Sequence, residues 1–177
     1  MRREAGTYAL ILHASRARSI RAGQLGHLKV RRGTYVYVGS AFGPGGVLAR
    51  VRHHGGISRA PHWHVDYLRP AVRIDEVWYS HDPVHREHQW AGVLAAMRGA
   101  SVPLPRFGAS DCRCGSHLFF FESPPSLRSF RGRIRAAAPE HRRLERAGAD
   151  KLASQDTPVE GVKRFPRKPD AAHREDA

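Results

Sequence analysis

The sequence predicts an α+β domain, in which a small and mainly antiparallel sheet of about three to four strands is flanked by helices. Short apolar or alternating segments, bounded by glycine, proline and polar residues, recur along the chain and are typical of strands. Segments with apolar residues at helical spacing lie between or after them. The connection from the first strand to the second is too short for a helical crossover, which favours antiparallel pairing of these two strands.

The first part of the domain is expected to contain two strands and one helix. Gly6–Ala14 is mostly apolar and rich in β-forming residues, as in a central strand. Residues 16–33 carry charges and glycines with few apolar positions, so we expect a connection with little regular structure. Thr34–Ser40 alternates like a second strand. A glycine-rich turn follows, and then a helix over Val47–His54 that two glycines end.

The second part alternates helices with strands. His62–Leu68 is predicted to be helical because Trp63 and Tyr67 lie four residues apart and a proline follows. Val84–Arg98 is the clearest helix, since its apolar residues form one stripe. The other predicted elements are a strand over Val72–Ser80, a proline- and glycine-rich loop over Gly99–Gly115, a strand over His117–Glu122 and a helix from Pro124 onward.

The predicted domain spans residues 1–138, and residues 139–177 are predicted to form a charged, mostly disordered tail. Beyond Pro139 the chain is a mixture of arginine, acidic residues, proline and lysine, and Phe165 is its only aromatic residue. Such a composition buries too little apolar surface to offset the entropy of ordering. The tail is either a basic arm for nucleic acid or a solvated terminus.

The charge balance favours a polyanionic partner. Lysine and arginine total 30 against 16 acidic residues, which gives a formal net charge of +14. Nucleic acid is the first partner to expect, ahead of an anionic membrane surface. The alternative is an arginine bias of the genome, although such a bias does not remove acidic residues. No segment approaches the ~18 apolar residues of a membrane span. Two cysteines one residue apart are poorly placed for a disulfide, so we expect a reducing, cytoplasmic setting.

Chemistry-bearing side chains gather between Gly33 and His54. Tyr35 and Tyr37 share one face of the predicted strand, and Arg50 and His54 lie one turn apart on the helix that follows. Phenols, a guanidinium and an imidazole therefore converge from one strand–turn–helix unit.

Two triplets on the first two strands resemble the name-giving motifs of the GIY-YIG nuclease superfamily. They are Gly6-Thr7-Tyr8 and Tyr37-Val38-Gly39, and Arg50 follows on a helix as in that superfamily. Three segments are similar to one uncharacterised branch of this superfamily, whose members occur alone or fused to base-excision DNA glycosylases. These segments are YVYVGSA, HWHVDYL and FGASDCRCGSHLF. The resemblance covers roughly residues 6–122.

The resemblance implies a metal-dependent DNA endonuclease, with a role in DNA repair. By position, Tyr8 and Tyr37 would face the site, Arg50 would bind phosphate, and His54 would match a histidine found one turn later in some members. Glu87 would match the single glutamate that binds Mg²⁺ or Mn²⁺.

Phosphodiester hydrolysis needs the types of residue found here. The reaction requires neutralised phosphate oxygens, a deprotonated water and a stabilised leaving oxygen. Arg50 can bind phosphate in a bidentate manner, and a divalent ion on Glu87 suits a phosphate substrate. We expect Tyr37 to be the base, Tyr8 to orient it and His54 to be a second proton-transfer group.

The same residues can also be explained by structural roles that involve no catalysis. A strand tyrosine is commonly a packing residue, and Glu87 can be a solvated helix carboxylate. Four other carboxylates compete for the metal: Asp66, Asp75, Glu76 and Asp111. Many superfamily members have lysine where Ser40 stands, so a non-catalytic nucleic-acid-binding module is the alternative function. Arg52 and His53 are the candidates to replace that charge. The residues expected to contact nucleic acid are Ser40, Arg52, His53, His62, His64 and Asp111.

A second cluster could bind zinc. Cys112, Cys114 and His117, with His62 or His64, offer thiolate and imidazole ligands. A single residue between two cysteines is an unusual spacing for structural zinc. The alternative is that both thiols pack as small apolar groups. A zinc-stabilised interaction domain is thus a third reading of the chain.

Overall fold

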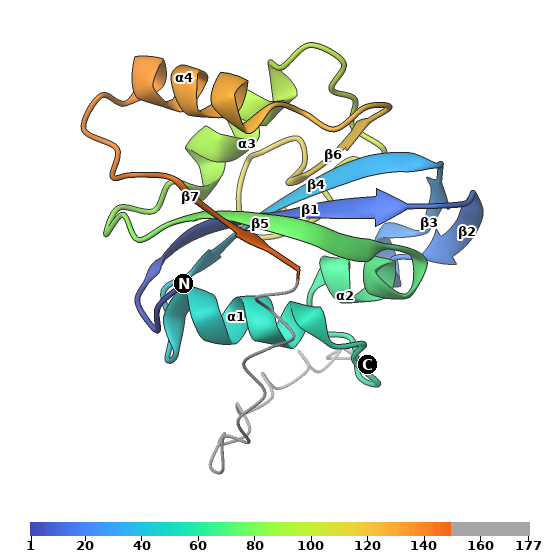
Figure 1. Ribbon diagram of the computed structural model, residues 1–177. Helices are drawn as coiled ribbons and strands as arrows, with labels where there is room; N and C mark the ends of the chain where they lie inside the picture. The colour runs from blue at the N-terminus through green and yellow to red at the C-terminus, as the bar shows by residue number, and fades with distance from the viewer. Residues whose placement is uncertain (150–177) are drawn as a thin grey trace, which may run out of the picture.

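The fold is built on a five-stranded sheet in which every neighbouring pair is antiparallel (Figure 1). The computed structural model describes residues 1–149. The strand order is β6–β4–β1–β5–β7, with bounds Leu118–Phe121 (β6), Gly33–Ala41 (β4), Gly6–Ala14 (β1), Arg73–Ser80 (β5) and Glu145–Gly148 (β7). The α+β class and the antiparallel sheet are confirmed.

Two long strands at the centre of the sheet carry both tyrosine triplets. β1 and β4 pair over their full lengths, so that Tyr8 lies opposite Gly39 and Leu10 lies opposite Tyr37. Alternation then places Tyr8 and Tyr37 on the same face of the sheet. Both tyrosines belong to one buried cluster, with Val47 and Val51 of the following helix.

Helices cover both faces of the sheet (Figure 1). α1 (Gly46–Gly55) and α2 (His64–Leu68) lie on the face that carries the tyrosines. α3 (Glu87–Ala95) and α4 (Leu127–Ala137) cover the other face, where Trp78, Trp90 and Phe130 form the centre of a second buried cluster. The sheet is therefore buried on both sides, which explains why β1 is mostly apolar and is buried along nearly its whole length.

The prediction of an irregular connection over residues 16–33 was wrong. A separate two-stranded hairpin forms there, with β2 (Arg18–Arg21) paired to β3 (His27–Val30) around a short 3₁₀ turn, η1 (Gly23–Leu25). Leu28 and Val30 are buried against the main core, whereas the intervening side chains are exposed. Each of these strands has only four residues, and their outer face is charged. The alternation of apolar and polar residues is therefore too short to indicate a strand from the sequence.

The predicted strand number was too low, because a fifth strand lies beyond residue 138. β7 pairs with the edge of β5 through residues that the sequence assigned to the tail. Leu144 and Ala147 are buried, while Arg146 pairs with Glu76 at 3.7 Å and the Tyr79 hydroxyl donates to Glu145 at 3.2 Å. Because this edge strand has few apolar side chains, its composition resembles that of a disordered tail, and the sequence did not indicate a strand there. The remainder of the predicted tail, residues 150–177, lies outside the described residues.

Helix boundaries differ modestly from the prediction. α3 begins at Glu87, three residues later than predicted, and ends at Ala95. Asp82 accepts a hydrogen bond from the Val84 N–H at 2.9 Å and stabilises the turn that precedes the helix. α2 begins at His64 and continues into a second 3₁₀ turn, η2 (Arg69–Ala71). No helix in the described part of the chain has the length and apolar character needed to cross a bilayer.

Candidate active site

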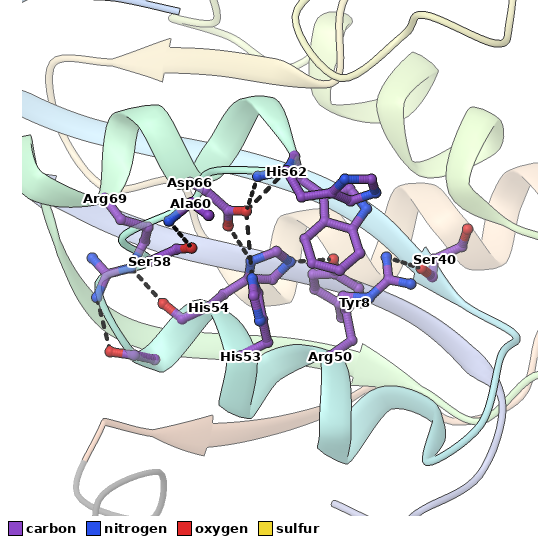
Figure 2. Close-up of polar contacts among 12 residues, drawn as sticks. Tyr8, Ser40, Arg50, His53, His54, Ser58, Ala60, His62, Asp66 and Arg69 are labelled. Atoms are coloured by element: carbon purple, nitrogen blue, oxygen red, sulfur yellow. Dashed lines mark hydrogen bonds and ion pairs between the residues drawn. The ribbon is translucent and has the colours of Figure 1, made fainter. Parts of the chain in front are cut away.

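Three buried side chains form a hydrogen-bonded series beneath the sheet (Figure 2). The hydroxyl of Tyr8 lies 3.0 Å from Nε2 of His54, and Nδ1 of the same imidazole lies 3.1 Å from Oδ1 of Asp66. Tyr8 comes from β1, His54 from the last turn of α1 and Asp66 from α2. All three are almost fully buried. The phenol of Tyr8 can therefore pass a proton to the imidazole of His54. The carboxylate of Asp66 can balance the positive charge that results.

The segment before α2 fixes the Asp66 carboxylate. Oδ2 of Asp66 accepts hydrogen bonds from the backbone N–H groups of His62 and Trp63, each at 3.0 Å. Burial raises the pKa of Asp66, but its hydrogen bonds with His54 and with these two N–H groups outweigh burial and hold the pKa far below its ordinary value. Asp66 is therefore a fixed anion against Nδ1 of His54.

The electrostatic environment keeps Tyr8 and His54 neutral. Burial raises the pKa of Tyr8, the Arg50 guanidinium opposes this shift, and the Glu87 charge adds to it. Burial also lowers the pKa of His54, although Asp66 offsets part of the effect. With Nδ1–H directed to Asp66, the unprotonated Nε2 of a neutral imidazole faces the Tyr8 hydroxyl and can accept its proton.

Tyr37 lies beside this series but outside its hydrogen bonds. Its ring stands edge-on to His54, with centroids 6.3 Å apart, and edge-on to Phe107 at 6.1 Å. Burial raises its pKa well above the ordinary value, and the nearby Tyr8 raises it further. Among the described residues the Tyr37 hydroxyl has no hydrogen-bond partner. The geometry thus favours Tyr8 over Tyr37, our sequence-based choice of base, as the proton-transferring phenol.

Arg50 is positioned by an aromatic ring and a backbone carbonyl. Its Cζ lies 4.2 Å from the ring centroid of Trp63, and its Nη1 donates to the Ser40 carbonyl oxygen at 3.4 Å. Figure 2 shows the guanidinium beside Tyr8, on the side of Ser40. A planar cation held in this way can bind a phosphate group next to Tyr8.

Glu87 reaches the same end of the sheet from the opposite layer. Ser40 donates its hydroxyl to Oε2 of Glu87 at 2.6 Å, and Nδ1 of His117 lies 2.9 Å from Oε1. Nδ1 of His117 is thus close to the carboxylate, although it is poorly aligned for a hydrogen bond. Burial raises the pKa of Glu87, yet His117 and Ser40 outweigh it and lower the pKa, so the side chain stays ionised.

Ser40 connects the two halves of the site. Its carbonyl accepts from Arg50 and its hydroxyl donates to Glu87. Within the described residues, no hydrogen bond joins Glu87 to Tyr8 or Tyr37, but the charge of Glu87 raises the pKa of both tyrosines. The lysine expected from the resemblance is thus replaced by a hydroxyl that orients the carboxylate.

The cysteines lie next to Glu87 and gain a partner that the sequence did not indicate. Cys112 Sγ lies 3.5 Å from His117 Nε2, and Cys114 Sγ lies 3.3 Å from Nδ1 of His88 on α3. Burial and the neighbouring Cys112 raise the pKa of Cys114 to about 11. These four residues could hold a metal ion, as could a second group that consists of His53, His54 and Asp66.

The other expected nucleic-acid contacts are spread over α1, α2 and the loop before β6. His62 and His64 line an open pocket of about 580 Å³ together with Arg21, Gln24 and Tyr67, and they lie outside the cysteine group. His53 Nε2 is 3.4 Å from Asp66 Oδ2 and the ring is partly exposed. Arg52 is on α1, and Asp111 is exposed on the loop before β6.

Sequence reasoning missed the roles of Asp66, Trp63 and His88. The sequence indicates Asp66 only as a competing metal ligand, although this residue lies within the segment HWHVDYL that supports the resemblance. His88 directly follows Glu87 but is far from the cysteines in the chain. Two of the other three competing carboxylates have local partners: Asp75 pairs with Arg73 at 2.7 Å, and Glu76 accepts a hydrogen bond from the Trp78 indole at 2.9 Å.

Comparison with known protein families gives a match. The family model described as "Domain of unknown function DUF123" matches residues 7–138, which is more than half of the chain. This span includes the site residues and ends before β7. Neither the curated proteins nor the solved structures gave a match.

Proposed function

We propose that this chain, which belongs to the DUF123 domain family, is a metal-dependent DNA endonuclease that hydrolyses phosphodiester bonds. The observation that carries the proposal is the series Tyr8–His54–Asp66, with Arg50 beside its phenol end. The resemblance of the two tyrosine triplets and Arg50 to the GIY-YIG superfamily supports it independently.

In the proposed reaction Tyr8 takes a proton from the attacking water. As it does so, the phenol passes its own proton to Nε2 of His54, 3.0 Å away, and the imidazole becomes a cation. The fixed anion of Asp66 stabilises that cation through Nδ1–H. The hydroxide oxygen forms a bond to phosphorus, the bond to the leaving oxygen breaks, and a proton from solvent neutralises that oxygen. The series then returns the His54 proton to solvent.

Arg50 binds the scissile phosphate in this proposal. Its planar guanidinium can donate two hydrogen bonds to non-bridging oxygens, while the face of the Trp63 ring holds its position. Because Arg50 also opposes the rise in the pKa of Tyr8, it favours ionisation of the phenol at the moment of proton transfer.

Glu87 is the residue proposed to hold Mg²⁺ or Mn²⁺. Its lowered pKa keeps it ionised, and Ser40 and His117 orient one oxygen each, which leaves further lone pairs free for a hard cation with several waters. A bound divalent ion would stabilise charge on the phosphate and on the leaving oxygen.

The proposed partner is DNA. The formal net charge of +14 favours association with a polyanion, and the pocket lined by Arg21, His62, His64 and Tyr67 offers cationic and aromatic groups near the site. Four arginines also line a pocket of about 650 Å³ beside α4: Arg131, Arg135, Arg142 and Arg143.

The test is cleavage of supercoiled and branched DNA with Mg²⁺ or Mn²⁺. We expect cleavage by the wild type, a fall of about 10²-fold or more in Tyr8→Phe, and loss of cleavage in Arg50→Ala and Glu87→Gln. Tyr35→Phe is the matched control, since Tyr35 is a buried tyrosine of β4 on the same face, with its hydroxyl bonded to Arg31. Absence of cleavage, or equal cleavage by all variants, would refute the proposal.

A second function, a non-catalytic nucleic-acid-binding module, is favoured by Ser40, where the superfamily commonly has lysine. It predicts salt-sensitive DNA binding that needs no metal and survives Glu87→Gln. Binding measured by fluorescence anisotropy on the same DNA, together with the cleavage assay, separates the two functions.

A further inference from the structure

Two thiols and two imidazoles face one another at the start of α3. Cys112, Cys114 and His117 come from the loop before β6, and His88 comes from the first turn of α3. One ligand atom from each residue lies within 4.8 Å of the other three. These segments are brought together only by the fold.

The spacing of these atoms suits a tetrahedral ion. A zinc ion with Zn–N of about 2.0 Å and Zn–S of about 2.3 Å keeps a sulfur and a nitrogen ligand about 3.5 Å apart. Cys112 Sγ and His117 Nε2 are 3.5 Å apart, and Cys114 Sγ and His88 Nδ1 are 3.3 Å apart. Both pairs therefore already have the separation of adjacent zinc ligands.

The loop explains how cysteines one residue apart can both face the ion. Nη1 of Arg106 donates to the carbonyl oxygens of Cys112 (2.7 Å) and Cys114 (2.9 Å), and the Arg106 N–H donates to the Gly115 carbonyl at 2.6 Å. Arg106 itself has a positive φ of 64°. This turn directs both thiols toward α3, so the unusual spacing that counted against zinc in the sequence is accommodated.

A carboxylate behind His117 completes the arrangement. Nε2 of His117 faces the cysteines, and the buried Nδ1 of the same ring lies 2.9 Å from Oε1 of Glu87. A histidine that binds zinc commonly directs its other ring nitrogen to a carboxylate, which fixes the ring and makes it a better ligand.

We propose that His88, Cys112, Cys114 and His117 bind one structural Zn²⁺ ion that fastens the loop over residues 96–117 to α3. Two thiolates and two imidazoles form a closed four-ligand set, which suits zinc and not the oxygen-preferring Mg²⁺ or Mn²⁺. The site is separate from the divalent ion proposed on Glu87, and it stands whether or not the chain cleaves DNA. A loop of this length without regular structure gains order from such a link.

Metal analysis of the untagged full chain, after gel filtration in metal-free buffer, tests the proposal. We expect about one zinc per chain in the wild type. Replacement by Co²⁺ should give the intense d–d absorption of a tetrahedral site and a thiolate-to-cobalt charge-transfer band. Cys114→Ser should lose that band or weaken it strongly, and His88→Ala should lower zinc affinity by at least tenfold in a competition with a chromogenic chelator.

Two control variants keep the experiment decisive. His27→Ala removes an exposed imidazole of β3 and should keep full zinc content. His53→Ala alters the second candidate group and should also keep it. Zinc that survives Cys114→Ser and His88→Ala but is lost in His53→Ala would overturn the proposal, as would stoichiometric iron, or a chain that folds by circular dichroism with no zinc and no cobalt spectrum.

Discussion

Gly39 lies directly opposite Tyr8 on the neighbouring strand, and a Cβ atom at this glycine would lie 2.4 Å from the Tyr8 hydroxyl oxygen. The glycine of the second triplet is therefore required by the tyrosine of the first. Its absent side chain provides the space in which the phenol reaches His54.

Gly39→Ala should accordingly displace Tyr8 and break its hydrogen bond with His54. We expect a loss of about 1–3 kcal/mol in the free energy of unfolding, measured by urea denaturation, because the Tyr8 ring is packed and cannot move freely. Gly92→Ala on α3 is the matched control, since nothing lies within 4 Å of its added methyl group. That change should stabilise the chain slightly. Equal stabilities of the two variants would contradict the prediction.

Asp66→Asn should uncouple His54 without removing its packing. The carboxamide oxygen can still accept the backbone N–H groups of His62 and Trp63, but the fixed anion against His54 is lost. If the proposed function holds, DNA cleavage should fall by about 10²-fold or more. Because Asp66 raises the pKa of His54, the variant should also lower this pKa, which NMR titration of the imidazole measures.

Asp75→Asn is the control for Asp66→Asn, since Asp75 pairs with Arg73 on the outer end of β5. It should keep wild-type cleavage and the wild-type titration of His54. A lowered pKa of His54 with full cleavage in Asp66→Asn would show that the series is structural and that the proposed proton path is wrong.

The positions of Tyr37, Arg50 and His54 in one strand–turn–helix unit could be predicted from the sequence because they rest on local periodicity. Tyr8 joins them through the pairing of β1 with β4, which periodicity does not give, and only the resemblance of the two triplets indicated it. Asp66 and His88 could not be found this way. Each meets its partner through tertiary packing: Asp66 with α1, and His88 with a loop beyond the end of its own helix.

Three short strands could not be predicted from the sequence for a different reason. β2, β3 and β7 have four residues each, and their outward faces are charged. Such strands are stabilised by pairing with a neighbour already present, so their own composition carries little signal.

The stability of the chain should fall at both ends of the pH range. Above about pH 10 unfolded tyrosine loses its proton, whereas burial raises the pKa of Tyr8 and Tyr37 in the folded chain, so stability is full below that pH and decreases above it. The folded pKa of His54 is lowered, so the unfolded chain takes up that proton first and stability decreases below about pH 6.5. Asp66 and Glu87, with lowered pKa values, add a further decrease below about pH 4.

Urea midpoints from pH 3 to pH 11 measure this dependence. Tyr8→Phe should flatten the alkaline decrease, without abolishing it because Tyr37 remains. An alkaline decrease of the same steepness in Tyr8→Phe and in the wild type would contradict the assignment.

Trp63→Leu should weaken the binding of phosphate but keep the hydrogen bonds of the Tyr8–His54–Asp66 series, because the backbone N–H of residue 63 still donates to Asp66. The edge-on contact of the Trp63 ring with His54, with centroids 5.4 Å apart, is lost as well. The ring lies 4.2 Å from the Arg50 guanidinium, and loss of such a contact at about 0.5–1 kcal/mol corresponds to a twofold to fivefold change. We expect that change in the Kd for DNA by fluorescence anisotropy, under the proposed function. Trp63→Phe retains an aromatic face and should restore most of the affinity, whereas equal affinities of the two variants would exclude the aromatic contribution.

Removal of zinc should release the loop over residues 96–117, if the proposed site exists. The loop carries exposed Arg113 within the cysteine turn, a natural trypsin site that the ion would hold in place. We expect a thiol-compatible chelator to lower the midpoint of thermal unfolding and to speed cleavage after Arg113 by at least tenfold, as followed by mass spectrometry. His88→Ala should behave like the chelated wild type even in added zinc, because α3 no longer supplies a ligand. His27→Ala should remain resistant. Cleavage after Arg113 at one rate with and without the chelator would show that the turn is held by Arg106 alone, and the zinc site would lose its structural role.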